Sequence, residues 1–397
     1  MRQVFLDWGG LPCNDRSMTA EELTEEALFE QGTARLAELL GPSWQIDRRP
    51  SGKEKHRSGG DIIVTLHAEG ESSYGQLLVD VELAGVSPRM VEEVLLAKLD
   101  LLRQLNHYTT LLVLTPWLSR QVQSLLRKHD ISYLDLMGNV SLRVPRPAIV
   151  IYTEGATRAP QALAKEPSRT TLAGPKAGRL VRVLTDVRPP FRAGELAQAS
   201  GLSLGYVSRL LDTLEDQLLI RRDGRVITFV DWPNLLRARA AREVLLRKGS
   251  FVGLLAPNGI PYVIKRIRHL PQSALANIAV TGTHAAHAVA PLSAGGQLMV
   301  YVSPRMDEDD LGDELGLLPV DENADVLLLQ ARDRSVFERS EIVEGVPHVA
   351  LSQVALDCLA GPGRMPAEGE AVIEYMKGHE DLWQVSGIHD LLTTPQL

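Results

Sequence analysis

Carboxylate residues occupy the ends of two neighbouring strand-like runs in "GGDIIVTLHAEGESSYGQLLVDVEL", residues 59 to 83. Asp61 opens the first run, and Asp80 and Glu82 close the second. Carboxylate oxygens are preferred ligands of Mg²⁺, and a bound cation can polarise a phosphodiester and activate water. Lys98, on the helix-like run that follows, could add a positive charge beside the phosphate. The pattern therefore predicts a Mg²⁺ site of Asp61, Asp80 and Glu82 that hydrolyses nucleic acid, assisted by Lys98.

The same carboxylates allow a second interpretation, in which they are ordinary strand-end residues of a domain that does not cut. Glu82 cannot give positive charge to a phosphate, and its carboxylate repels the other two. We expect no cofactor in that case, and Mg²⁺ only if the site is active. Both interpretations stay open, and an inactive scaffold is the one we favour.

The runs that must hold these residues alternate between helical and strand patterns. A long amphipathic helix comes first, two strands follow, and then helix, strand, helix and strand. This order predicts a mixed sheet with helices on its faces. The expected runs are 19–40, 61–66, 76–83, 87–105, 109–116, 117–130 and 131–136, with short strands at 141–144 and 148–153.

This first block resembles the PD-(D/E)xK nuclease-like fold over most of its length. The resemblance implies that Asp61 and Asp80 are the two metal-binding acids of that family. It also implies a lysine two residues after the second acid, where this chain has Glu82 in "VDVEL". Further along, "DLMGN" predicts a turn in which Asp135 and Asn139 bond to backbone groups.

The net charge of −8 hides an uneven distribution along the chain. Residues 161–250 hold 16 Lys and Arg against 9 Asp and Glu, and residues 301–397 hold 6 against 20. A basic segment of this size favours an anionic partner such as nucleic acid. The acidic end is expected to face a protein partner or to limit nonspecific binding to DNA.

The basic segment follows a linker-like stretch at 153–174, which is rich in Ala, Pro, Thr and Gly. Two short helical runs, a longer one and a hairpin then come in order, and Asp223 with Gly224 marks the hairpin turn. Gly201 stands where a sharp turn between two helices is needed. A last helical run is expected at 231–249. The order is that of a winged helix-turn-helix.

The third helical run and the hairpin carry the residues expected to touch DNA, because a helix in this position reads the major groove and a wing touches phosphates or the minor groove. The stretch "FRAGELAQASGLSLGYVSRLLDTLEDQLLIRRDGRVITF" resembles bacterial winged helix-turn-helix regulators, which implies double-stranded DNA as partner and a homodimer. A winged helix that docks only onto protein is the alternative. The expected contacts are Ser203, Tyr206, Ser208 and Arg209 on the helix and Arg221, Arg222 and Arg225 on the hairpin, with Arg179, Arg182, Arg188 and Arg192 adding charge nearby.

The rest of the chain alternates strand-like and helix-like runs and predicts another α/β domain. The runs "IAVTGTHAAHAVAPLSAGGQLMVYVS" and "EGVPHVALSQVALD" resemble the C-terminal domain of the AbiEi antitoxin family. The resemblance implies a repressor of its own operon with a nucleotidyltransferase-like toxin as partner. The long first block departs from the short antitoxins, so the toxin-neutralising role stays open.

Composition favours a reducing cytoplasm, because the two cysteines, Cys13 and Cys358, stand far apart. No apolar run reaches the roughly 18 residues that a membrane-spanning helix needs, so no membrane partner is expected. His284 and His287 share a helix-like run without a third ligand, and we interpret them as ordinary helix residues rather than a zinc site. The acidic run at 305–315 lacks the spacing of a calcium loop and predicts a solvated face.

We therefore expect an α/β multidomain chain in four parts. These are a restriction-endonuclease-like α/β domain (1–152), a linker (153–174), a winged helix-turn-helix (175–248) and a C-terminal α/β domain (249–397). The function that fits best is a DNA-binding transcriptional regulator, an antitoxin-like repressor, with the nuclease-like domain as scaffold or sensor. The alternative is a metal-dependent DNA nuclease that the winged helix targets.

Overall fold

The chain divides into two compact units, Met1–Pro167 and Ser168–Leu397, and each has its own hydrophobic core. The structure is a computed structural model, and it describes residues 24–49, 62–70, 74–105, 108–156, 171–247, 249–292, 296–320 and 322–393. Within these ranges, no helix is both long and apolar enough to cross a membrane.

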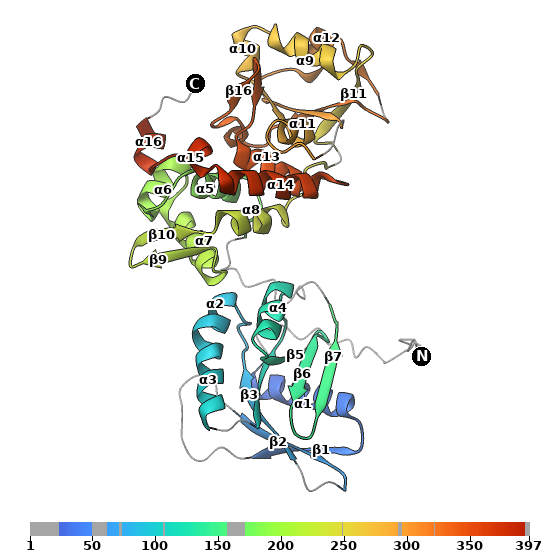
Figure 1. Ribbon diagram of the computed structural model, residues 1–397, viewed down its shortest axis with the longest axis vertical. Coiled ribbons are helices and arrows are strands. Elements are labelled where there is room, and N and C mark those ends of the chain that lie inside the picture. The colour runs from blue at the N-terminus through green and yellow to red at the C-terminus, as the bar shows by residue number, and fades with distance from the viewer. Residues whose placement is uncertain are drawn as a thin grey trace. The chain divides into compact units, whose positions relative to one another are not determined.

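A seven-stranded mixed sheet forms the middle of the first unit (Figure 1). Its strands lie in chain order, so each strand pairs with the next one. The strands from β1 to β3 and from β5 to β7 are antiparallel, while β3, β4 and β5 run parallel. The strands are β1 (Trp44–Arg49), β2 (Ile62–Ala68), β3 (Tyr74–Val81), β4 (Thr109–Thr115), β5 (Ser132–Asp135), β6 (Val140–Val144) and β7 (Ile149–Thr153).

Helices cover both faces of this sheet, as the order of sequence runs predicts. Successive side chains of a strand point to opposite faces. On β4, Leu112 and Leu114 join the core beneath α1, while Leu111 and Val113 join the core beneath α3 and α4. The helices are α1 (Glu25–Leu40), α4 (Arg120–Lys128), and one continuous helix made of α2 (Pro88–Met90), a π-helical turn (Val91–Leu95) and α3 (Leu96–Leu105).

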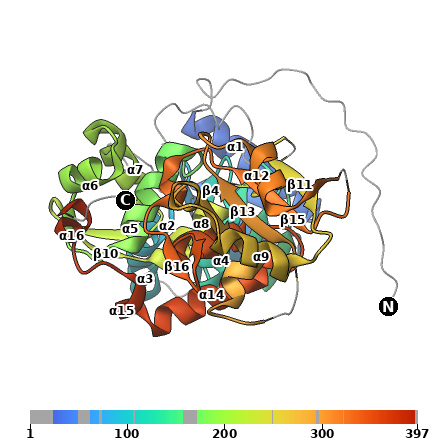
Figure 2. The same cartoon turned by 90° about the horizontal axis from the view of Figure 1, so that it is seen from above.

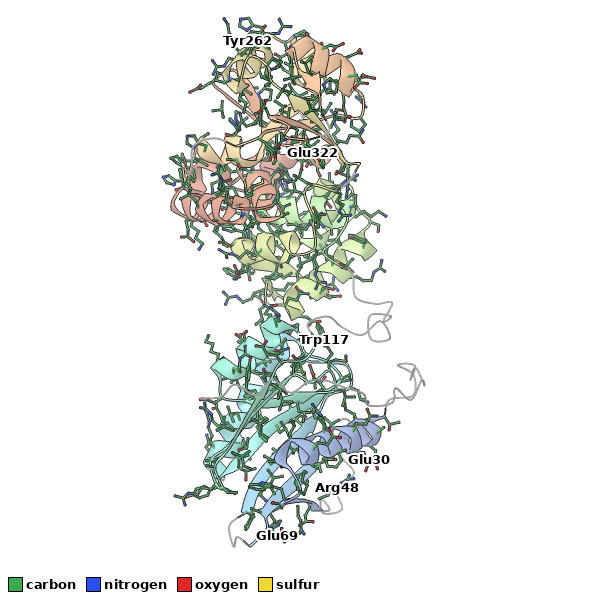
Figure 3. All side chains as sticks on the ribbon, turned by 90° about the vertical axis from the view of Figure 1, so that its right-hand side faces the viewer. Glu30, Arg48, Glu69, Trp117, Tyr262 and Glu322 are labelled. Atoms are coloured by element: carbon green, nitrogen blue, oxygen red, sulfur yellow. The ribbon has the colours of Figure 1, made fainter. Side chains whose placement is uncertain are left out.

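The first helix is fixed mainly by its buried apolar face. Thr24 caps it, since its Oγ1 accepts a hydrogen bond from the backbone N of Ala27 at 3.2 Å. Arg48 of β1 reaches the same helix, with its guanidinium 4.9 Å from the ring centroid of Phe29 (Figure 3). Arg48 also forms an ion pair with Glu26 of this helix. Such exposed ionic and cation–π contacts add little free energy, so the burial of Phe29 and its apolar neighbours contributes most to holding the helix on the sheet.

The turn predicted at "DLMGN" is confirmed. Asp135 ends β5 and is buried, and its Oδ1 accepts hydrogen bonds from the backbone N of Met137 and of Asn139, both at 2.9 Å. Its Oδ2 accepts from the backbone N of Leu118 at 3.0 Å and from Nδ2 of Asn139 at 2.8 Å. Burial raises the pKa of Asp135, and these four hydrogen bonds oppose the rise. The carboxylate thus organises the loop between β5 and β6.

The second unit begins with helices and a small sheet in winged-helix order. The sheet has the strand order β8–β10–β9, and both pairs are antiparallel. Helices α6 and α7 lie side by side, in green in Figures 1 and 2. The elements are α5 (Pro175–Asp186), β8 (Phe191–Arg192), α6 (Ala193–Ser200), α7 (Leu204–Asp216), β9 (Ile220–Asp223), β10 (Val226–Val230) and α8 (Trp232–Ala240).

The helix after the wing is shorter than the sequence pattern predicts. The expected helix runs over 231–249, but α8 ends at Ala240. Beyond it, the backbone N of Leu245 donates to the carbonyl of Ala360 at 3.2 Å. A hydrogen bond to a distant element replaces a helical one, and local periodicity does not reveal such a partner.

A second seven-stranded sheet fills the rest of this unit, with the order β14–β11–β15–β13–β12–β17–β16. Its strands are β11 (Phe251–Leu255), β12 (Ile278–Thr281), β13 (Leu298–Val302), β14 (Leu318–Pro319), β15 (Val326–Gln330), β16 (Glu341–Val343) and β17 (Val346–His348). Its helices are α9 (Ile260–Arg268), α10 (Gln272–Leu275), α11 (Gly282–His287), α12 (Glu308–Leu315), α13 (Leu351–Leu359), α14 (Met365–Gly378), α15 (Glu380–Trp383) and α16 (Ile388–Thr393).

One continuous core joins the winged helix to this sheet. It contains Leu180 of α5, Leu235 of α8 and Val354 of α13. Helix α13 packs on both α5 and α8 (Figure 1). The boundary that the sequence predicts at residue 249 therefore falls inside a single compact unit.

Candidate nucleic-acid interface

The helix-turn-helix consists of α6, a tight turn and α7. Gly201 ends α6 with φ of +63°, a conformation that glycine adopts without strain. Ser203 caps α7, since its Oγ accepts a hydrogen bond from the backbone N of Tyr206 at 3.4 Å. The opposite side of α7 is fixed by packing, because four of its residues are fully buried: Val207, Leu210, Leu211 and Leu214.

The predicted contact residues on α7 differ in exposure. Ser203 and Arg209 are exposed, while Tyr206 and Ser208 are half-buried. Tyr206 packs against the core, and burial raises the pKa of its hydroxyl. Arg209 is therefore the exposed cation of this helix.

Two exposed residues in the first turn of α7 are absent from the sequence prediction. Leu204 is 54% exposed, and Gly205 follows it on the surface. The sequence prediction rests on side chains that can form hydrogen bonds or ion pairs, and neither leucine nor glycine has such a side chain. Their position was the available signal, since the first residues of such a helix meet base edges.

Strands β9 and β10 form the predicted hairpin, with Gly224 in the left-handed region at its turn. Arg221 faces Phe229 across the strands, and its guanidinium lies 4.4 Å from that ring centroid. Arg225 is exposed beside the turn. Over the described ranges, we find no ion pair for Arg209, Arg221 or Arg225. Their positive charges face solvent.

Arg222, the remaining arginine of the hairpin, is held by α7. Its Nε lies 3.0 Å from Oε2 of Glu215, and its Nη2 lies 2.8 Å from Oδ1 of Asp212. The hydrogen bond with Glu215 raises the pKa of Arg222, with Asp212 adding to the effect and burial opposing it. These carboxylates neutralise Arg222 and tie the wing to α7.

Of the four arginines expected near the first helices, Arg192 is exposed and the other three are paired with carboxylates of the second unit. Nη2 of Arg179 lies 2.7 Å from Oδ2 of Asp333, and Nη2 of Arg188 lies 2.7 Å from Oδ1 of Asp381. Arg182 is buried, with 2% of its surface exposed. Among the described residues, part of the positive charge of the basic segment is thus unpaired on the surface, and part is neutralised in ion pairs, of which the Arg182 pair is buried.

Arg182 belongs to a buried polar network that joins α5 to the C-terminal sheet. Its Nη1 donates to Oε1 of Gln353 at 2.9 Å, and Nε2 of Gln353 donates to Oδ1 of Asp357 at 2.8 Å. Oγ1 of Thr281 and the hydroxyl of Tyr301 donate to the same carboxylate at 2.6 Å and 3.1 Å. Burial raises the pKa of Asp357 to about 6, against the lowering effect of these hydrogen bonds.

Asp357→Asn is expected to change how the stability of the second unit depends on pH. The folded-state pKa of Asp357, about 6, lies above its ordinary value of 3.8. Between these values the folded chain keeps a proton that the unfolded chain has released, so stability falls as pH rises through this window. Asparagine removes that fall of about 3 kcal/mol, at roughly 1.4 kcal/mol per pH unit. Urea unfolding of both proteins from about pH 4 to 7 checks this, and a constant free-energy difference would contradict it.

Of the predicted carboxylate site, the structure describes Asp80, Glu82 and Lys98. Nζ of Lys98 lies 2.7 Å from Oδ2 of Asp80, which is buried at the end of β3. Glu82 is half-buried, and its carbonyl accepts from Oγ1 of Thr115 at 2.8 Å. Asp61 lies outside the described residues. In the part of the chain that the structure describes, no group of three or more His, Cys, Asp or Glu could hold a metal ion, the histidines of α11 included.

Comparison with known families agrees with this geometry at the winged helix. Residues 176–224 match the model of the IclR helix-turn-helix domain, from the first turn of α5 to the turn of the wing. No curated protein and no solved structure matches the chain. The middle of the chain is thus a helix-turn-helix domain of a kind that binds DNA, which supports a transcriptional regulator.

Proposed function

We propose that the protein is a transcriptional regulator that binds double-stranded DNA through α7 and the β9–β10 hairpin. The observation that carries the proposal is that Arg209, Arg221 and Arg225 lie exposed on this helix and hairpin, while Arg179, Arg188 and Arg222 form ion pairs with carboxylates of the same unit. Exposed guanidinium groups on a helix and its adjoining wing suit a polyanionic duplex.

Each residue has a separate role in this proposal. Arg209 reaches base edges or phosphates from the outer face of α7. Arg221 and Arg225 contact the sugar-phosphate backbone from the wing, and Ser203 contacts a phosphate from the helix start. Arg222 does not bind DNA directly; its pairs with α7 set the angle of the wing.

Arg209→Ala is expected to weaken specific DNA binding by about 1–3 kcal/mol if the guanidinium contacts a base. Arg225→Ala removes a phosphate contact, so it should weaken binding to all sequences alike and lower the salt slope by about one. Binding of the full chain to duplexes selected from a random 30-base-pair library, measured over a range of salt concentrations, checks both.

Arg305→Ala is the matched control, because it removes the same charge from an exposed loop after β13, away from the winged helix. It should leave affinity and salt slope unchanged. Equal losses in all three variants would mean that only net charge matters and would count against this placement of the interface. Failure to select any duplex would remove the proposal itself.

A homodimer and an antitoxin-like repressor are finer parts of the same proposal. They rest on the resemblance of the C-terminal runs and on the usual pairing of such regulators with two half-sites. A nucleotidyltransferase-like toxin would be the protein partner. Co-purification with the product of the neighbouring gene tests the partner, and sedimentation of the free protein tests the dimer.

A metal-dependent nuclease is the second candidate, and one observation favours it. Nζ of Lys98 lies 2.7 Å from Oδ2 of Asp80. Lys98 thus brings to this site the ammonium group that Glu82, at the family's lysine position, lacks. If Mg²⁺ were bound, Asp61, Asp80 and Glu82 would be its ligands, and it would supply the Lewis acid that polarises a phosphodiester. Cleavage of plasmid in Mg²⁺ or Mn²⁺ that is lost in Asp80→Ala would support this activity. Plasmid that stays intact with both metals would support the interpretation of this domain as an inactive scaffold.

A further inference from the structure

The first residue of α7 is a leucine whose side chain stands in solvent. Leu204 is 54% exposed, although the apolar residues on either side, Leu202 and Tyr206, pack against the core. A single exposed leucine is common on protein surfaces and needs no explanation by itself. This one occupies the position from which a helix in the major groove meets base edges.

Gly205, the next residue, is not required by the fold. A Cβ placed there would meet no atom within 4 Å, and its backbone is ordinary helix rather than left-handed. Glycine inside a helix lowers stability relative to alanine. A bare backbone at this point instead permits close approach of another molecule, which is a common use of glycine.

The major groove presents one apolar group to such a surface, the C5-methyl of thymine. We propose that Leu204 packs on a thymine methyl of the operator and that Gly205 lets the start of α7 come close enough for this contact. The assignment rests on the proposed DNA-binding function and deepens it, because it names a base that the helix reads. Arg209, further along the same helix, would then add a polar contact to a neighbouring base.

The test replaces thymine with deoxyuridine in the duplexes that the wild-type chain selects from the random library. Deoxyuridine keeps the hydrogen-bonding groups of thymine and lacks only the methyl. Replacement of a contacted thymine should weaken wild-type binding roughly fourfold for each methyl removed, the effect of one buried methyl group. Leu204→Ala should bind the thymine duplex more weakly than wild type and show no further loss with deoxyuridine.

Two controls make the outcomes distinct. Deoxyuridine outside the selected site should change nothing, and the unchanged thermal midpoint of Leu204→Ala should confirm that an exposed side chain was removed without unfolding. Wild-type binding that ignores deoxyuridine at every position, or equal deoxyuridine sensitivity in Leu204→Ala, overturns the assignment but leaves the DNA-binding function standing. Selection of no duplex at all overturns both.

Discussion

Arg182→Ala is expected to destabilise the second unit by about 3–5 kcal/mol, because it leaves buried polar groups without their cation. Nε and Nη2 of Arg182 bond to Oδ2 of Asp186 at 3.3 and 3.1 Å. Its guanidinium also donates to the carbonyls of Ser335 and Glu338 at 3.3 and 3.1 Å, and to Gln353. Alanine would remove the donor of the Glu338 carbonyl and of Gln353, while the Ser335 carbonyl would keep its hydrogen bond from the backbone N of Glu338 at 3.2 Å. Among the described residues, Asp186 would keep the 3.6 Å pair with Arg339.

Hydrogen–deuterium exchange under increasing urea measures this change separately from the first unit, through amides of α5 and α13. Arg209→Ala is the control, since it removes the same charge from a surface position and should shift stability by less than about 0.5 kcal/mol. In a DNA-binding experiment, Arg209→Ala becomes the test variant: it should lose affinity for DNA although its stability is unchanged. Equal stability of both variants would show that the network contributes little.

The order of helices and strands in the winged helix followed from sequence because its signals are local. Gly201 has the left-handed backbone that the turn needs, and Gly224 has it in the hairpin. The apolar spacing on α7 placed Leu210 and Leu214 in the core, where both are fully buried. Each of these features depends on residues within a few positions of one another, so a single sequence is enough to find them.

The fate of the arginines could not be predicted in the same way. Arg179 is separated from its partner Asp333 by more than 150 residues, and Arg188 from Asp381 by more than 190. A sequence window therefore counts both arginines as available cations. Only the folded unit, in which the C-terminal elements lie beside this segment, shows that both arginines are paired.

The acidic end of the chain has a related explanation. Part of its negative charge is paired with the basic segment of the same unit, as in Glu370 with Arg237 and Asp333 with Arg179. The sequence expectation that this end faces a separate protein or screens DNA treated the two charge blocks as independent. Another part does stay in solvent, since Asp309 and Asp310 in the first turn of α12 are exposed.

The candidate carboxylate site was the least accessible to prediction. Asp80 lies at the end of β3 and Glu82 just after it, as their spacing in the sequence requires, but the approach of Lys98 depends on how α3 packs on the sheet. The sequence predicts Lys98 beside a phosphate and names no contact with Asp80, so the role of Lys98 in a nuclease stays a prediction. The remaining acid, Asp61, lies outside the described residues, so the three-carboxylate arrangement stays a prediction.

Asp135→Ala is expected to destabilise the first unit by about 3–5 kcal/mol. The carboxylate is fully buried and accepts hydrogen bonds from Leu118, from Met137 and twice from Asn139. Each buried donor left without an acceptor costs about 1–3 kcal/mol, and entry of water reduces the sum. Exchange of the β4 and β5 amides under urea measures the loss in this unit alone.

Asp135→Asn separates the shape of this side chain from its acceptor capacity. Asparagine keeps an oxygen toward the backbone N of Met137, but its amide would face the donor of Leu118, so about half of the loss should remain. Asp100→Ala, which removes an exposed carboxylate from α3, should cost less than about 0.5 kcal/mol. If Asp135→Ala proved no worse than Asp100→Ala, the turn would not depend on these hydrogen bonds. If it proved far worse, the loop would be holding β4 as well, since the backbone N of Leu136 donates to the carbonyl of Thr115 at 3.3 Å.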